Sequence, residues 1–302
     1  MYKVLVTGGA GFLGSRLAEE NVRIGNQVEV WDLCEKETAK YPIYGIDMND
    51  EELVMERLQD FQPDIIFHCA GSADVRVSVE MPKLDFERNV CITHNLLFGL
   101  HKLNMHTTRL IFLSSAAVYG NPISLPIKEN MELNPLSPYA LHKAMCENVC
   151  TYFRKNYGID VRIARIFSAY GNGLKKQIFW DMYQKILKTG ELNMFGTGRE
   201  SRDYIHVDDV VQALMLIAKQ EKNSQHIYNV ANGEETEIKQ AAELFAQCAG
   251  ISEDRIHFDG TVREGDPLNW CADITRLKSL GYQKRISINK GVLDYYKWVN
   301  EQ

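Results

Sequence analysis

Several common features are scarce or absent in this 302-residue sequence. Its seven cysteines are scattered, and the closest pair, Cys146 and Cys150, has neither CxxC nor zinc-site spacing. We therefore expect free thiols in a reducing cytoplasm and no bound metal. No apolar run approaches about 18 residues, and the chain enters a predicted strand at once, so we expect neither a membrane span nor a signal peptide.

An excess of positive charge is also missing. The net charge of −6 excludes a general attraction of the whole molecule to nucleic acid or to an anionic membrane. An anionic ligand would have to be met by a local group of arginines.

What the sequence does contain is a regular alternation of short apolar runs and amphipathic stretches up to Phe167. The apolar runs are continuous, which is typical of parallel strands covered on both faces. The pattern predicts an α/β fold with a doubly wound parallel (Rossmann) sheet. Strands are expected at 4–6, 28–31, 43–46, 64–67, 109–113 and 161–166, and helices at 12–24, 51–60, 84–104 and 139–157.

After Phe167 the rhythm loosens into glycine-rich loops and shorter elements. We predict that residues 1–167 form the Rossmann domain, with about 204–232 returning to it. Residues 168–302 would mostly form a smaller α/β domain that binds substrate over the carboxyl edge of the sheet, where ligands of such sheets lie.

The first predicted strand ends in a glycine-rich turn that carries Gly8, Gly11 and Gly14. Glycines at this spacing allow a tight turn, close approach of the backbone to a pyrophosphate and close helix–strand packing. Asp32 ends the next strand, where an acid can bind a ribose 2′-hydroxyl and repel a 2′-phosphate. The turn therefore predicts NAD rather than NADP. Asp47, after the third strand, either touches the adenine or is an ordinary loop acid.

Tyr139 and Lys143 lie four residues apart and share one face of a predicted helix. A neighbouring ammonium favours the phenolate of a tyrosine, so the pair can exchange a proton with a sugar hydroxyl. Ser114 and Ser115 end the preceding strand at the same edge, and Ser115 is placed to hydrogen-bond the oxygen that Tyr139 deprotonates.

These motifs resemble, in order and over nearly the whole chain, those of the extended short-chain dehydrogenase/reductases, in particular the nucleotide-sugar epimerase/dehydratase family. The matching segments are TGGAGFLG (7–14), HCAG (68–71), Asn89, SSAAVYG (114–120), YALHK (139–143), RIFSAYG (165–171), RDYIHVDD (202–209) and REGD (263–266).

The resemblance implies that Tyr139 is the catalytic base, that Lys143 lowers its pKa and holds the nicotinamide ribose, and that Ser115 assists. It implies a homodimer through the helices that start near Leu84 and Tyr139, although these helices could equally be buried within a monomer. The implied NAD contacts are Gly8, Gly11, Phe12, Leu13, Gly14, Asp32, Asp47, Ala70, Asn89, Tyr139 and Lys143. His68 and Cys69 we interpret as packing near the cofactor rather than as catalytic.

Within this family, 4,6-dehydratases have Asp-Glu directly after the catalytic hydroxyl residue, whereas this chain has Ala116 and Ala117. Methyl groups transfer no protons, so we expect C4 epimerisation of an NDP-hexose through a 4-keto sugar. Two alternatives stay open: a 4-keto-sugar reductase that consumes NAD(P)H, and a dinucleotide-binding sensor without catalysis.

For the substrate, the resemblance favours Arg202 and Arg263 as contacts to a diphosphate and Asp266 as a contact to the nucleoside ribose. Ser168 stands where the family commonly has Asn, which puts that amide contact in doubt. Trp270 falls where 4-epimerases limit the space around the C2 substituent, so a bulky indole would disfavour an N-acetyl group. UDP is the expected nucleotide because it is common in the family.

Overall fold

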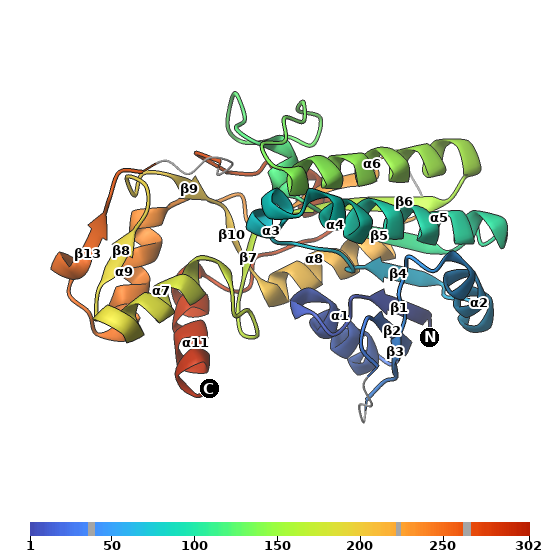
Figure 1. The fold of residues 1–302 in the computed structure, drawn as a ribbon, viewed down its shortest axis with the longest axis horizontal. Coiled ribbons are helices and arrows are strands. Elements are labelled where there is room, and N and C mark those ends of the chain that lie inside the picture. The colour runs from blue at the N-terminus through green and yellow to red at the C-terminus, as the bar shows by residue number, and fades with distance from the viewer. Residues whose placement is uncertain (36–39, 222–224, 262–266) are drawn as a thin grey trace.

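The computed structural model describes residues 1–35, 40–221, 225–261 and 267–302. Within these ranges, seven parallel strands form a central sheet in the order β11-β6-β5-β4-β1-β2-β3, so the predicted doubly wound parallel fold is confirmed (Figure 1). The chain builds outward from β1 to β3 and then returns to the other side of β1 with β4. This reversal creates a crevice at the carboxyl ends of β1 and β4. The strands are β1 (Lys3–Thr7), β2 (Gln27–Asp32), β3 (Ile43–Gly45), β4 (Ile65–His68), β5 (Arg109–Ser115), β6 (Asp160–Ile166) and β11 (Ile227–Val230).

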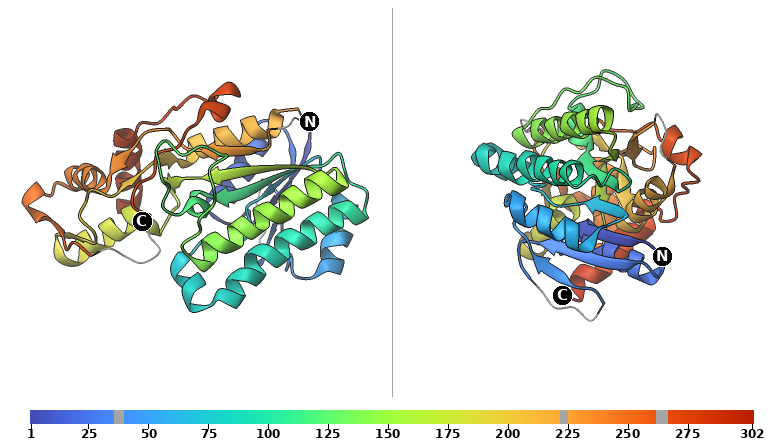
Figure 2. Two further views of the ribbon diagram at one scale, coloured as in Figure 1. Left: turned by 90° about the horizontal axis from the view of Figure 1, so that it is seen from above. Right: turned by 90° about the vertical axis from the view of Figure 1, so that its right-hand side faces the viewer.

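Helices cover both faces of this sheet, which explains why its strands are apolar throughout. Successive side chains of β1 point to opposite faces, so Val4 and Val6 join one buried cluster and Leu5 joins the other. On one face lie α1 (Phe12–Arg23) and α8 (Val207–Lys219); on the other lie α2 (Glu51–Phe61), α5 (Ile92–Lys102) and α6 (Pro138–Tyr157). Figure 2 shows α5 and α6 side by side on the outer surface of the molecule.

The helix that carries Tyr139 has strong stop and start signals. Ser137 is its N-cap and accepts from the backbone N–H of Ala140, and Pro138 occupies the first helical position. Gly158 ends the helix in the left-handed conformation. These residues fix where Tyr139 stands along the helix axis, one residue after the helix begins.

The helix predicted at 84–104 is wrong as a single continuous α-helix. The chain forms α3 (Val75–Glu80) and α4 (Pro82–Phe86), then a π-helical turn, η1 (Glu87–Cys91), and only then α5. A π-helical turn accommodates an extra residue and is frequent at functional sites. Hydrophobic periodicity does not reveal it, because the flanking α-helical turns keep the same buried face.

Beyond β6 the chain builds a second lobe, at the left of Figure 1. Its helices α7 (Gln177–Thr189), α9 (Ile238–Ala249) and α11 (Ile288–Asn300) pack around a separate core that includes Phe179, Phe245 and Tyr295. Short strand pairs complete it: β7 (Ser168–Tyr170) with β10 (Tyr204–His206), β8 (Leu192–Met194) with β13 (Ile256–Phe258), and β9 (Ser201–Arg202) with β12 (Thr236–Glu237). The short helix α10 (Thr275–Ser279) packs against β11 instead, and its Leu277 belongs to the core of the first lobe.

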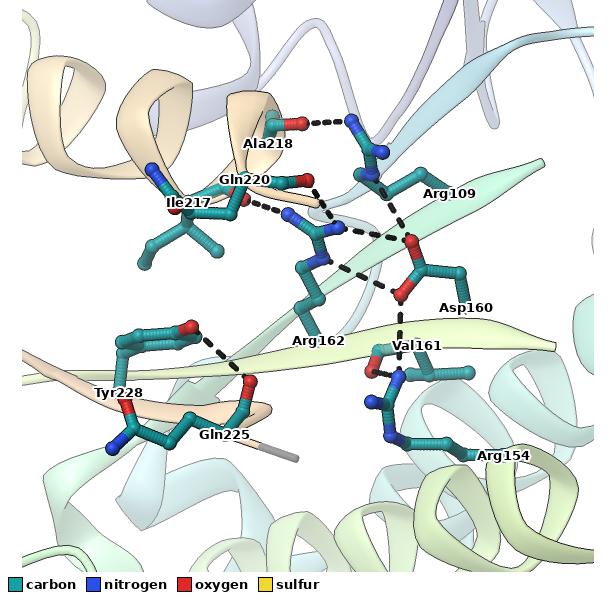
Figure 3. Close-up of polar contacts among 10 residues, drawn as sticks. All are labelled: Arg109, Arg154, Asp160, Val161, Arg162, Ile217, Ala218, Gln220, Gln225 and Tyr228. Atoms are coloured by element: carbon teal, nitrogen blue, oxygen red, sulfur yellow. Dashed lines mark hydrogen bonds and ion pairs between the residues drawn. The ribbon is translucent and has the colours of Figure 1, made fainter. Parts of the chain in front are cut away.

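Between β10 and β12 the polypeptide returns to the first lobe. β11 pairs with β6 at the edge of the central sheet, and α8 packs against α1. Arginines at the amino ends of the strands hold the last turn of α8. Arg109 donates to the carbonyl of Ala218, and Arg162 donates to those of Ile217 and Gln220 (Figure 3).

Asp160 keeps these guanidinium groups in place. Its carboxylate accepts from Arg162 at 3.0 Å, from Arg109 at 3.1 Å and from Arg154 at 3.2 Å. Burial alone would raise the pKa of Asp160, but the hydrogen bonds and charges of Arg162 and Arg109 outweigh this effect and lower it. The cluster lies at the amino edge of the sheet, opposite the crevice, so its task is to anchor α8. No helix in the described ranges has the length and hydropathy of a transmembrane span.

Candidate active site

The crevice begins at the glycine-rich turn after β1. Gly8 has a φ of +67°, and a Cβ atom on it would lie 2.6 Å from the backbone nitrogen of Ala70. A Cβ on Gly14 would lie 2.7 Å from Gly9 Cα. Such distances leave room only for hydrogen, so the turn lies directly against the chain that leaves β4 and against the start of α1.

The amino terminus of α1 points into this crevice. Its N-cap residue is Gly11, which brings no side chain to the first N–H groups, and Phe12 and Leu13 open the helix. Free N–H groups and the positive end of the helix dipole suit a pyrophosphate. The loop after β7 passes nearby, because a Cβ on Gly173 would lie 3.6 Å from the Phe12 ring.

Asp32 stands at the end of β2, beside the same turn. One carboxylate oxygen accepts from the backbone N–H of Ala10 at 2.9 Å, and the other accepts from that of Leu33 at 2.8 Å. These bonds hold a negative charge next to the turn, where it would favour a ribose hydroxyl over a phosphate. Asp47 is exposed after β3 and accepts from the backbone and side chain of Asn49, so its contact to adenine stays a prediction.

Asn89 lies in the π-helical turn on the opposite wall of the crevice. Its amide nitrogen donates to the carbonyl of Asp85 at 3.0 Å, while its buried Oδ1 has no hydrogen-bond partner among the described residues. An unpaired buried acceptor is costly, and a donor on a bound molecule would remove that cost. Together with the glycine cradle, this acceptor makes the crevice fit a dinucleotide.

Tyr139 and Lys143 project from the first two turns of α6. The backbone N–H of Tyr139 donates to the Ser78 hydroxyl at 3.1 Å, and Lys143 Nζ donates to the carbonyl of Leu113 at 3.1 Å. Lys143 is buried, with its ammonium 4.9 Å from the centre of the Phe112 ring. Helix α6 is therefore fixed to the carboxyl end of β5, and the Lys143 side chain is held inside the crevice.

The two serines at the end of β5 have different surroundings. Ser114 is buried and donates to Glu147 at 2.6 Å, and Glu147 in turn pairs with Arg165. Ser115 accepts from the N–H of Ala117 at 3.1 Å and starts the 3₁₀ turn η2 (Ala116–Tyr119). As an acceptor there, Ser115 keeps its hydroxyl hydrogen for donation to a substrate oxygen.

On the substrate side, the structure brings Arg202 and Trp270 together. The guanidinium of Arg202 lies 5.5 Å from the centre of the Trp270 ring. The Trp270 indole donates to the carbonyl of Gly120 at 3.0 Å, which ties it to the loop after Ser115. Ser168 is half-buried, and its backbone N–H donates to the carbonyl of Asp203. Arg263 and Asp266 lie outside the described residues.

Sequence reasoning assigned no role to two residues that position this site. Ser78 holds the backbone of Tyr139, and it stands in an otherwise ordinary helical stretch. Asp203 is buried and accepts from the N–H groups of Asn232, Gly233 and Ala272, so it joins the strand of Arg202 to two loops. Burial raises the pKa of Asp203 to about 7, although these backbone donors oppose the rise.

Comparison with known proteins shows which family this chain belongs to. Residues 4–231 match the NAD dependent epimerase/dehydratase family. The chain belongs to that family. The predicted resemblance is thus confirmed, and with it the expectation of an NAD-dependent enzyme.

One relative and two solved structures show the extent of the similarity. A UDP-glucose 4-epimerase of Lactobacillus helveticus is 31% identical, with 98% of this chain and 96% of the relative covered. Among solved structures, the UDP-glucose 4-epimerase of Thermotoga maritima with UDP-glucose superposes with a TM-score of 0.90 at 27% identity. There, 99% of each chain is covered. The Thermus thermophilus UDP-glucose 4-epimerase with NAD gives 0.88 at 27% identity, again with 99% of each chain covered.

The close contact at Gly8 generates a prediction with a matched control. Gly8→Ala and Gly25→Ala both place a side chain at positive φ, but nothing lies within 4 Å of a Cβ on Gly25. Gly25→Ala should therefore cost about 1–2 kcal/mol of stability and leave NAD binding intact. Gly8→Ala should in addition abolish NAD binding, as measured by the NAD content of the purified protein. Equal NAD content in the two variants would contradict the proposed cradle.

Proposed function

We propose that this protein is an NAD-dependent nucleotide-sugar 4-epimerase, which inverts C4 of an NDP-hexose through a 4-keto intermediate. The observation that carries the proposal is the chemistry at the end of β5. Ser115 ends β5 there, α6 brings Tyr139 and Lys143 against that strand with Lys143 bonded to the Leu113 carbonyl, and the two residues after Ser115 are a fully buried alanine and a half-buried one. This constellation supplies one proton-transfer group and lacks the adjacent acid and base that water elimination requires.

In this proposal Tyr139 takes the proton of the C4 hydroxyl and later returns it to the C4 oxygen. Lys143, buried one helical turn further along α6, would hold the nicotinamide ribose, and Ser115 donates a hydrogen bond to the same C4 oxygen. Bound NAD supplies the chemistry of reversible hydride acceptance at C4. Because the hydride and the proton both return to the sugar, the reaction consumes no cofactor, and the epimer is the net product.

One lobe would bind the cofactor and the other the nucleotide sugar. Residues 1–167, with about 204–232, would hold the cofactor through Gly8, Gly11, Phe12, Leu13, Gly14, Asp32, Asp47, Ala70, Asn89, Tyr139 and Lys143. Residues 168–302 would hold the nucleotide sugar, with Arg202 and Arg263 on the diphosphate, Asp266 on the ribose and Ser168 and Trp270 near the sugar. The relatives named for UDP-glucose favour UDP as the nucleotide.

Replacement of Tyr139 tests the proposed chemistry. Tyr139→Phe should lower kcat for interconversion of UDP-glucose and UDP-galactose by about 10²–10⁴-fold, because general acid–base catalysis contributes that much. Bound NAD should be retained, since the phenyl ring keeps its packing. Tyr2→Phe, at an exposed tyrosine that precedes β1, is the control and should leave kcat within about twofold.

The same assay separates the alternatives. Turnover that consumes NAD(P)H stoichiometrically with a 4-keto sugar would identify a reductase. Retained NAD without conversion of any UDP-, GDP-, CDP- or dTDP-sugar, by wild type as well as Tyr139→Phe, would identify a sensor.

Trp270 is proposed to set the size of the C2 substituent. Its indole is fixed by Gly120 on one side and by the Arg202 guanidinium on the other, so it cannot easily turn away. Wild type should therefore turn over UDP-glucose at least tenfold faster than UDP-N-acetylglucosamine, and Trp270→Leu should narrow that ratio. Trp180→Leu, on α7, is the control. Faster turnover of the N-acetyl sugar by wild type would contradict this role.

A homodimer through α5 and α6 is proposed as the working form, in the cytoplasm. The outer faces of these helices form an apolar hollow lined by aromatic and histidine side chains, the exposed Tyr152 among them, and Leu141 and Met145 are exposed on the same helix. Native mass spectrometry should show twice 34.6 kDa for wild type and 34.6 kDa for Val149→Asp. A wild-type particle of single-chain mass would contradict the dimer.

A further inference from the structure

The side chain of His68 joins the two walls of the cofactor crevice. His68 ends β4 and is fully buried, with its ring between two threonine hydroxyls. Thr7 Oγ1 lies 2.7 Å from Nδ1, and Thr93 Oγ1 lies 3.1 Å from Nε2. Thr7 directly precedes Gly8, and Thr93 follows the π-helical turn that carries Asn89.

The neighbouring bonds determine the direction of this chain. The Thr93 hydroxyl donates its single hydrogen to the carbonyl of Asn89 at 2.7 Å, so it must accept from His68 Nε2–H. Nδ1 is then the acceptor and takes the hydrogen of Thr7. Thr7 Oγ1 in turn accepts from the backbone N–H of Ala70 at 3.3 Å. From the Ala70 N–H to the Asn89 carbonyl, each group thus donates a hydrogen bond to the next one.

His68 keeps this tautomer because it stays neutral. Burial, followed by the nearby Lys143 ammonium, lowers the pKa of His68 to about 3. The ring therefore gains no second N–H at working pH, and the polarity of the chain does not reverse.

The two ends of the chain are both at the proposed NAD contacts. Ala70 is the residue against which Gly8 packs, and Asn89 carries the buried oxygen that has no partner in the described part of the protein. A hydrogen-bond chain of fixed polarity and fixed length holds these two contacts at one separation. A ring that only filled the core would impose no such separation.

We propose that His68 is a positioning residue for the cofactor: through Thr7 and Thr93 it sets the distance between the glycine-rich turn and the helix of Asn89, and thereby determines how tightly NAD is held. The inference rests on the NAD site of the proposed function. His68 itself touches neither cofactor nor substrate in this role.

The test removes the two hydroxyls while it keeps the branched shape of each side chain. Thr7→Val and Thr93→Val should each raise the dissociation constant of NAD about fivefold or more, as expected for loss of one buried hydrogen bond. Thr108→Val is the matched control. It also removes a buried threonine hydroxyl, one that donates to the carbonyl of Pro63 at 2.7 Å at the opposite edge of the sheet. Its NAD affinity should change less than twofold.

The combined effect of the two substitutions on NAD binding distinguishes one connected hydrogen-bond chain from two independent hydrogen bonds. Because either substitution releases both walls, Thr7→Val/Thr93→Val together should weaken NAD binding less than the product of the single effects. Thr93→Ser, which restores a hydroxyl, should recover wild-type affinity within about twofold. Single effects below twofold, or effects that multiply independently, would overturn the proposal.

A spectroscopic measurement does not depend on the variants. The ¹⁵N resonances of His68, assigned with His68→Phe, should show Nε2 protonated and Nδ1 bare from pH 5 to 8 in the holoenzyme. The reverse tautomer, or titration of His68 within that range, would contradict the proposed hydrogen-bond chain. If wild type bound no NAD at all, the proposed function would fail; if wild type bound NAD and the threonine variants matched it, only the role of His68 would fail.

Discussion

The site depends on one steric constraint, the contact between the glycine-rich turn after β1 and the chain that leaves β4. A Cβ on Gly8 would approach the Ala70 nitrogen to 2.6 Å, so this contact exists only without a side chain. It occurs where the strand order reverses, at the crevice of a doubly wound sheet. The amino end of α1, Asp32 and the His68 chain are all placed relative to it.

The chemistry of the crevice follows from which charges it encloses. Lys143 is buried against the Phe112 ring and the carbonyl of Leu113, and its charge contributes to the lowered pKa of His68. The buried carboxylate of Glu147 is neutralised by Arg165 and is directed at Ser114. In the proposed function the site therefore uses one phenol, that of Tyr139, together with the Ser115 hydroxyl, which suits transfer of a hydride and one proton.

The sheet and its cofactor-binding edge were largely predictable, because their sequence patterns recur along the chain or have characteristic spacing. Continuous apolar runs indicated the buried parallel strands, and the glycine spacing, Asp32 and the Tyr139–Lys143 pair marked the cofactor edge. The π-helical turn at Asn89 was missed because one extra residue leaves the hydrophobic pattern unchanged. The roles of Ser78, Asp203 and the partners of His68 were missed because their bonds join segments that are distant in sequence.

The fate of the C4 hydrogen tests the central claim most directly. Wild-type protein would be given a mixture of two substrates: UDP-glucose deuterated at C4, and UDP-glucose that carries ¹³C but no deuterium. The products would be analysed by mass spectrometry. The proposed mechanism predicts UDP-galactose that keeps its deuterium, with no transfer to the ¹³C molecules and no net NADH. Loss of deuterium to water, or its appearance in ¹³C product, would contradict epimerisation by return of the same hydride within one bound complex.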